Sequence, residues 1–302
     1  MAEIKTNKIV IAGASGSLGK IVLDALLASD KFIVTVLSRE GSQATLPSSV
    51  RATKVNYDSV EQLTAALDGQ DAVICTFAAR AIESQVPLIQ AAVNARVKRF
   101  IPSEFTADIG NPKAARLPPY KGQIRIHALL QETAREMPEF SYTSIRNGVF
   151  LDWGLALGFQ VDLRSEHPPF FDGGDRPFST TTLATVAAAV VAVFDHLDET
   201  KNRALYVHDV VTTQRHLLTL ARQIAPKRRW EPVQVSTEDM ERVAREKHAK
   251  GQDGLEGSMG FFCRSVFAEG YGGEFQQVDN ALLGLGCKTD ADLEILLGTC
   301  MC

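Results

Sequence analysis

The sequence predicts an α/β fold, in which a doubly wound parallel sheet is joined to a smaller α/β lobe. Strands and helices alternate over roughly residues 8–146, one apolar strand runs directly into three spaced glycines, and the alternation loosens beyond about residue 155. Strands that alternate with helices form βαβ units, in which the strands lie parallel. The 302 residues are enough for two lobes. We therefore expect one domain over 1–155 and a second over 156–302, with interleaved boundaries.

The first expected strand, Lys8–Ala12, leads into Gly13, Gly16 and Gly19, and the helix that follows has apolar residues at helical spacing. Glycine permits a tight turn, close approach of backbone to a pyrophosphate, and close packing of helix on strand. The helix N-terminus also offers unpaired N–H groups and a positive dipole. This pattern favours a Rossmann-type dinucleotide site over a purely structural turn, with these residues in contact with the cofactor: Gly13, Ala14, Ser15, Gly16, Ser17, Leu18 and Gly19.

The choice of dinucleotide depends on the end of the second expected strand, Phe32–Leu37. In NAD-binding proteins an acid about 20 residues beyond the glycines binds the ribose 2′-hydroxyl. Here the strand ends in Ser38 and Arg39, a hydroxyl and a planar cation that suit a 2′-phosphate. Glu40 can be interpreted as the displaced acid, and Arg39 as a solvated surface charge. We interpret the pair as favouring NADP(H).

Later elements follow from hydrophobic period and capping residues. In the first half we expect strands at 51–55, 71–76, 99–101 and 141–146, and helices at 59–67 (capped by Ser59), 83–94 and 120–136, with a long loop before the last helix. In the second half we expect helices at 182–196, 213–224, 237–248 and 290–297 and a strand at 204–208.

One window of the second half stands out in composition. Seven of the chain's 22 glycines lie between Gly251 and Gly273, with Phe261 and Phe262 among them. Such a segment suggests a mobile flap with aromatic side chains that covers a flat substrate. A plain surface loop is the alternative.

Composition excludes several classes of protein. Hydrophobic residues make up 45% and charged residues 23%, and the net charge is −4, which disfavours a nucleic-acid or anionic-membrane surface. The basic cluster at 227–229 is expected to be a solvated turn, and no apolar run is long enough to cross a bilayer. The five cysteines, at 75, 263, 287, 300 and 302, have no metal-ligand spacing and form no prenylation box. We expect a cytoplasmic protein without a metal; the sequence does not choose between a monomer and a homodimer.

The acid–base group of the expected reaction is not a tyrosine. Many folds of this kind use a Tyr-x-x-x-Lys pair, and no tyrosine of this chain has a lysine four residues later. Lys121 begins a predicted helix after Pro118 and Pro119, and Arg125 lies one turn later on the same face. A lysine sheltered beside a second cation can lose its proton more readily and act as acid or base. By spacing alone, a surface lysine is the more common interpretation.

Several segments occur in a familiar order: the glycine segment, Val73–Ala78, Val97–Phe105, Lys121-x-x-x-Arg125 and Tyr142-Thr-x-x-Arg-Asn147. Together they resemble the isoflavone-reductase-like proteins of the NmrA-like atypical short-chain dehydrogenases. The resemblance covers roughly residues 7–150 and is weak beyond. It implies NADPH-dependent reduction of a small, often aromatic, metabolite.

The resemblance also assigns residues. It implies that Lys121 is the proton acid or base, with Arg125 near the cofactor. It further implies that the dinucleotide and its nicotinamide are lined by Thr76, Phe77, Ala78, Ser103, Glu104, Phe105, Asn147, Val149 and Phe150. Asp108 and Glu104 are candidate polar contacts at the same edge, although a loop carboxylate is usually solvated.

Two departures from the family pattern stand out. Ser48 occupies a position where the family often has a second basic residue, and the next cation is Arg51, which predicts weaker affinity for the 2′-phosphate. The family's substrate-side histidine has no recognisable match among His208, His216 and His248. Structural roles are the default for all six histidines.

Two other functions remain open. NmrA-like proteins include regulators that sense the redox state of a dinucleotide without turnover and dock on transcription factors. The same fold can also carry a non-redox catalyst, for dehydration or cyclisation. Lys121 and the expected flap favour the reductase, since a sensor needs neither a proton shuttle nor a lid.

Overall fold

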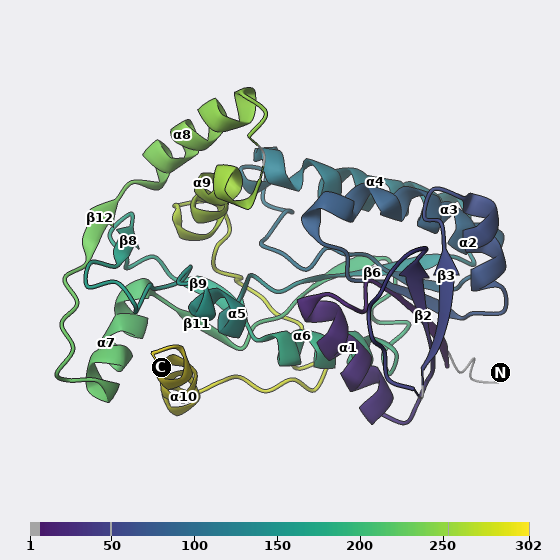
Figure 1. Cartoon of the computed structure of the whole chain (residues 1–302), viewed down its shortest axis with the longest axis horizontal. Coiled ribbons are helices and arrows are strands. Elements are labelled where there is room, and N and C mark those ends of the chain that lie inside the picture. The colour runs from purple at the N-terminus through teal and green to yellow at the C-terminus, as the bar shows by residue number, and fades with distance from the viewer. Residues whose placement is uncertain (1–6, 49, 253, 302) are drawn as a thin grey trace. The chain divides into compact units, whose positions relative to one another are not determined.

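The computed structural model describes residues 7–48, 50–252 and 254–301 (Figure 1). Positions 1 and 302, the outer limits of the expected domains, therefore lie outside the described residues, and position 302 is also one of the five cysteines. Position 253 of the expected flap lies outside them as well. The described chain forms two compact units. The first takes its residues from Met1–Glu104, Gly122–Ile145 and Val186–Leu205, and the second from Phe105–Lys121, Arg146–Thr185 and Tyr206–Cys302. Which part binds cofactor and which binds substrate, as expected for 1–155 and 156–302, stays a prediction.

The first unit is built on a seven-stranded sheet in the order β10-β6-β5-β4-β1-β2-β3, and every neighbouring pair from β6 to β3 is parallel. The strands are β1 Lys8–Ala12, β2 Ile33–Arg39, β3 Arg51–Val55, β4 Ala72–Cys75, β5 Arg99–Ile101, β6 Ser141–Arg146 and β10 Arg203–Tyr206. The predicted doubly wound α/β fold is confirmed.

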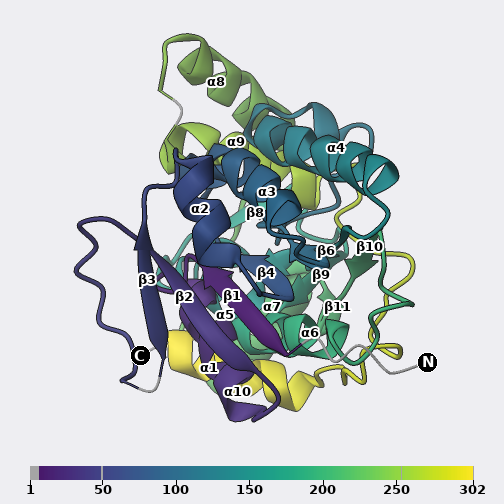
Figure 2. The ribbon, with the colours of Figure 1, turned by 90° about the vertical axis from the view of Figure 1, so that its right-hand side faces the viewer.

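Helices cover both faces of this sheet (Figure 2). They are α1 Ser17–Ala28, α2 Val60–Leu67, α3 Gln85–Asn94, α4 Lys121–Glu136 and α6 Leu183–Val193. Helices α2, α3 and α4 share a core with alternate residues of the strands, among them Val10, Val73 and Phe100. Helix α1 lies on the opposite face. Strands buried on both faces explain the continuous apolar runs of the sequence.

The second unit contains two small sheets, β11-β9-β7 and β12-β8. Its elements are β7 Val149–Phe150, α5 Leu151–Ala156, β8 Pro169–Phe171, β9 Phe178–Thr181, β11 Val210–Thr212, α7 Gln214–Ile224, β12 Val233–Val235, α8 Thr237–Ala249, α9 Leu255–Phe267 and α10 Asp290–Cys300. Its core gathers around Phe267, whose ring lies 5.0 Å from Phe171 and 5.2 Å from Phe178, centroid to centroid. Most of its short strands have no periodic signal and were not predicted.

The expected flap is wrong for most of its length, because residues 255–267 form helix α9 and Phe261 is fully buried. Three of the glycines, Gly257, Gly260 and Gly273, serve close packing. A Cβ on Gly260 would lie 2.2 Å from Met240 O of α8, and one on Gly273 would lie 2.0 Å from Val266 O. Real side chains never approach backbone so closely, so glycine is required here by contact and not by mobility.

Among the described residues, no helix combines the length and apolar character needed to cross a membrane. The expected cytoplasmic location stays a prediction.

Candidate functional site

The glycine loop lies in the first unit, between the carboxyl end of β1 and the start of α1. Gly13 has φ +94°, in the left-handed region that glycine favours. Gly16 N donates to Gly13 O at 3.0 Å and caps α1 without a side chain. Ser15, Gly16 and Ser17 are exposed, so the first turn of α1 presents its N–H groups at the surface. Such a turn can bind an anion.

The three glycines differ in what surrounds them. A Cβ on Gly19 would lie 2.1 Å from Gly13 O, and a Cβ on Gly13 would lie 2.7 Å from Thr76 O. A Cβ on Gly16 would meet its nearest neighbour, Gly13 O, at 3.4 Å, which is ordinary contact. Gly13 and Gly19 are thus required for the loop to pack on β4, whereas nothing in the packing of the described residues requires Gly16. Close approach of a pyrophosphate to the backbone is the reason for glycine that the dinucleotide motif predicts at this position.

The end of β2 lies beside this loop, since Ala12 of β1 is in register with Leu37 of β2. Ser38 is half-buried, and Arg39 is exposed at the last position of the strand. Within 7–48, 50–252 and 254–301, Arg39 forms no ion pair. An exposed, unpaired guanidinium at this strand end can bind a phosphate bidentately.

Side chains join the carboxyl ends of β1, β4 and β5. Thr76 Oγ1, after β4, donates to Ala12 O of β1 at 3.1 Å. Ser103 Oγ donates to Phe77 O at 2.8 Å, and the buried Gln85 accepts from Ser103 N at 2.8 Å. The predicted cofactor-lining segments 76–78 and 103–104 therefore lie together with the glycine loop at one edge of the sheet. Open α/β sheets bind ligands at this edge.

Glu104 is not the solvated loop carboxylate that its position suggested, because it is only 1% exposed. Its Oε2 lies 2.9 Å from His127 Nδ1 of α4 and accepts from Ser144 Oγ of β6 at 3.0 Å. Burying a carboxyl group costs free energy unless it is hydrogen-bonded, and these two contacts offset that cost. The three side chains tie α4 to the ends of β5 and β6. Sequence reasoning missed His127 and Ser144, since no local pattern links them to Glu104.

Helix α4 carries the predicted acid–base group. Lys121, its first residue, belongs to the second unit and is exposed. Arg125 belongs to the first unit, where its guanidinium forms an ion pair with Glu83. The charge of Arg125 is therefore balanced by a carboxylate, which the spacing argument for Lys121 had not foreseen.

The remaining predicted residues, Phe105, Asn147, Val149 and Phe150, lie in the second unit. Phe105, Val149 and Phe150 are half-buried. Asn147 is fully buried, and its Nδ2 donates to Gly148 O at 3.3 Å. Its Oδ1 has no hydrogen-bond partner among the described residues. A buried orphan acceptor suits a ligand that brings an amide or hydroxyl donor.

Asp108, also in the second unit, is held by protein groups. Its Oδ1 accepts from Tyr206 Oη at 2.7 Å and lies 3.3 Å from Arg146 Nη1. Burial, followed by the hydrogen bond to Asp108, raises the pKa of Tyr206 to about 12. These contacts favour a structural role for Asp108, which joins the loop after β5 to the end of β10.

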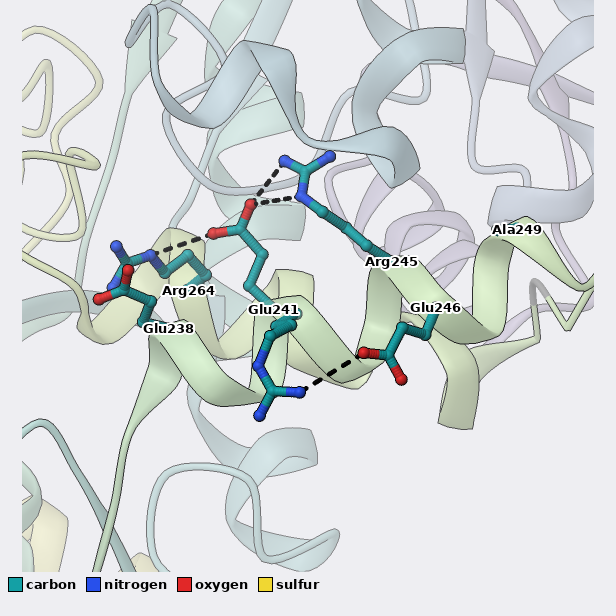
Figure 3. Close-up of a pocket in the computed structure, with 7 residues that line it drawn as sticks. Glu238, Glu241, Arg245, Glu246, Ala249 and Arg264 are labelled. Atoms are coloured by element: carbon teal, nitrogen blue, oxygen red, sulfur yellow. Dashed lines mark hydrogen bonds and ion pairs between the residues drawn. The ribbon is translucent and has the colours of Figure 1, made fainter.

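A depression of about 510 Å³ lies on α8 and α9 (Figure 3). None of the predicted site residues lines it. Three glutamates and three arginines line it together with one alanine. Glu241 lies between Arg245, at 2.5 Å, and Arg264, at 3.2 Å. Because these charges neutralise one another, the depression offers no net charge to a ligand and serves to join the two helices.

Comparisons with known proteins place the chain in a family. The profile of the NmrA-like family matches residues 5–246. The oxidoreductase aprR of Aspergillus flavus is 32% identical over 271 residues, which cover 89% of this chain and 90% of that protein. This chain therefore belongs to the NmrA-like family, as the motif resemblance predicted.

Solved structures share the fold. A structure described as AtPrR2 with NADP⁺ and (+)pinoresinol has a TM-score of 0.78 at 19% identity, and covers 98% of this chain and 100% of its own. An isoflavone reductase has a TM-score of 0.77 at 20% identity, with 97% and 99% covered. The resemblance to isoflavone-reductase-like proteins is thus confirmed in the fold.

Proposed function

We propose that this protein is an NADPH-dependent oxidoreductase of the isoflavone-reductase-like type, which reduces a small aromatic or secondary-metabolite substrate. The observation that carries the proposal is Gly16, a glycine that the packing of the protein does not require, in an exposed helix N-terminus near the exposed Arg39 at the carboxyl edge of a parallel sheet. The names of the relatives support it, since aprR is called an oxidoreductase and a structural neighbour holds NADP⁺.

The described residues fit the cofactor. The N–H groups of the first turn of α1 would hold the pyrophosphate, and Ser38 and Arg39 the 2′-phosphate. The orphan Oδ1 of Asn147 is suited to an amide donor such as the nicotinamide carboxamide. When bound, NADPH supplies the hydride.

The chain's own contribution is position and a proton. We assign the proton that balances the hydride to the Lys121 ammonium, which delivers it directly or through a water. The side-chain network of Glu104, His127 and Ser144 holds α4 against the ends of β5 and β6 in the first unit. Preorganised polar groups of this kind lower the cost of charge development during reaction.

The first test is calorimetric titration of the protein with NADPH and NADH. We expect NADPH to bind more tightly, and Arg39→Ala to lose most of that preference, because an arginine–phosphate contact contributes about 1.5–3 kcal/mol. Arg80→Ala, an exposed arginine of the same unit, is the control. If neither dinucleotide gives a heat of binding, the protein does not use this cofactor and the proposal is wrong.

The second test is turnover with NADPH and a panel of aromatic ketones, enones and benzylic ethers. Lys121→Ala should lower kcat by roughly 100-fold or more, the usual contribution of a positioned acid or base. Lys201→Ala, at an exposed turn, should leave kcat unchanged. Product without loss of NADPH would instead identify a non-redox catalyst, and selective binding of one redox form without turnover would identify a sensor.

A further inference from the structure

The residue that precedes Lys121 is anchored on helix α9. Tyr120 is 3% exposed, and its Oη lies 2.8 Å from Ser265 Oγ. Its ring meets Phe262 edge to face, with centroids 6.1 Å apart and planes at 66°. Tyr120, Lys121, Phe262 and Ser265 all belong to the second unit, although Tyr120 and Ser265 are 145 residues apart in sequence.

The direction of this hydrogen bond follows from its surroundings. Ser265 Oγ donates to Phe262 O at 2.8 Å. Because a hydroxyl has a single hydrogen, Ser265 must accept from Tyr120. Burial raises the pKa of Tyr120 to about 12, so the phenol remains a donor at neutral pH. The hydrogen bond from Tyr120 to Ser265 is therefore present at neutral pH.

Helix α9 is itself firmly held. Its Gly260 packs against Met240 O of α8 so closely that no side chain fits. Arg264, next to Ser265, donates to Thr237 Oγ1 at 2.9 Å and pairs with Glu241 (Figure 3). The same guanidinium lies over the Tyr271 ring at 4.9 Å. Because packing and ion pairs both fix helix α9, the helix can in turn fix the position of the Tyr120 side chain that contacts it.

The main chain of Lys121 has little freedom relative to that of Tyr120. Pro118 and Pro119 fix their own φ angles, and Tyr120 N donates to Leu117 O at 3.1 Å. The next Cα lies 3.8 Å beyond that of Tyr120. We propose that the Tyr120–Ser265 hydrogen bond and the Phe262 contact position the Lys121 ammonium for proton exchange. The proposal rests on the proposed function. In this proposal helix α9, which the sequence predicted to be part of a mobile flap, supports the proton donor.

The test compares Tyr120→Phe and Ser265→Ala with the parent chain. Tyr206→Phe is the matched control, because it also removes a hydrogen-bonded phenol hydroxyl of the second unit, from a half-buried tyrosine. The readout is competitive acetylation of individual lysines across pH, measured by mass spectrometry on the full chain. We expect the labelling rate of Lys121 to change by at least about threefold in both variants, since one buried hydrogen bond is lost. The control and the labelling of Lys201 should stay unchanged.

An unchanged Lys121 labelling profile in both folded variants would overturn the proposal, and thermal unfolding of each variant shows that it is folded. Where a reducible substrate is in hand, the pH–rate profile should shift and kcat should fall with the KM for NADPH unchanged.

Failure of the two proposals can be told apart. If Lys121→Ala keeps full activity while the labelling shifts remain, the acid–base role is lost and the anchoring of Lys121 stands. If Lys121→Ala is inactive while labelling and pH profile are insensitive to Tyr120 and Ser265, the anchoring is wrong and the reductase stands.

Discussion

At Gly13 and Gly19 an added side chain would collide with backbone, whereas at Gly16 it would not. We predict that Gly19→Ala lowers the free energy of unfolding by about 1–3 kcal/mol, the usual cost of overpacking. Gly16→Ala should lower it by about 1 kcal/mol or less, because alanine is a poorer N-cap than glycine but meets no backbone collision there. Yet Gly16→Ala should weaken NADPH binding by roughly tenfold or more, since its methyl group occupies the space a pyrophosphate needs.

Denaturant unfolding and NADPH titration of the two variants separate these effects. Wild-type affinity in Gly16→Ala would show that the loop is a structural turn and not a phosphate cradle.

His208 predicts a pH dependence of stability. Ser179 Oγ accepts from Phe275 N at 3.0 Å and lies 3.1 Å from His208 Nδ1. Burial lowers the pKa of His208 from its ordinary 6.5, although Asp209 and Glu274 oppose the shift. Below about pH 6.5, His208 therefore binds a proton more readily in the unfolded chain than in the folded chain. The free energy of unfolding should therefore fall as the pH is lowered.

Urea unfolding between about pH 7 and pH 5 checks this prediction, with His208→Gln as the comparison. The variant should lose less stability over that interval than the parent chain. Parallel pH profiles for the two proteins would contradict the assignment.

Residue roles were predictable where the cause is local. Ser59 caps α2 by accepting from Gln62 N, only three residues away, and the sequence predicted it. The burial of Glu104 depends on His127, 23 residues on, and on Ser144, 40 residues on, and no pattern in the chain links them. The candidate site was predicted by its motifs, and its supporting contacts were not.

At the scale of elements, Arg99 joins β5 to the segment after α6. The guanidinium is 3% exposed and donates to Ser141, Thr143 and Thr200 at 2.7–3.0 Å, and to Leu197 O. Burial lowers the pKa of Arg99 to about 10, so it stays charged at neutral pH. We predict that Arg99→Met lowers the free energy of unfolding by about 3 kcal/mol, because several buried acceptors lose their donor.

Chemical denaturation of Arg99→Met measures this cost. Arg80→Met, an exposed arginine of the same unit, should shift stability by less than about 0.5 kcal/mol. A loss in Arg99→Met no larger than in Arg80→Met would mean that the guanidinium contributes nothing net to the fold.

Elements with a strong period were predicted closely, and strands 51–55, 99–101 and 141–146 match the structure residue for residue. Helix α9 was interpreted as a flap because seven glycines obscured its period. Gly260 of α9 is explained by the approach of α8, and Gly257 by that of Gln252 O, and only the tertiary structure reveals these contacts. The short strands of the second unit depend on non-local pairing in the same way.

At the scale of the whole molecule, the chain passes between the two units in six segments, so no single cut separates them. The sequence suggested interleaving but not its extent, since residues 186–205 show no signal that assigns them to the sheet of the first unit. Strand β10 is the edge strand beside β6, and Leu197 and Thr200 accept hydrogen bonds from Arg99.

This arrangement predicts the behaviour of a fragment. Residues 1–155 alone lack β10, so one side of β6 is unpaired and the buried Arg99 loses two of its acceptors, Thr200 and Leu197 O. We therefore expect no cooperative unfolding transition. A peptide of residues 183–206, added in trans, supplies the edge strand and the two acceptors, and should restore cooperative unfolding with a midpoint that rises with peptide concentration. Circular dichroism during thermal unfolding follows both. If the fragment alone unfolds as cooperatively as with the peptide, then β10 and its preceding segment are appended to a complete domain, and the stability assigned to Arg99 must arise within 1–155.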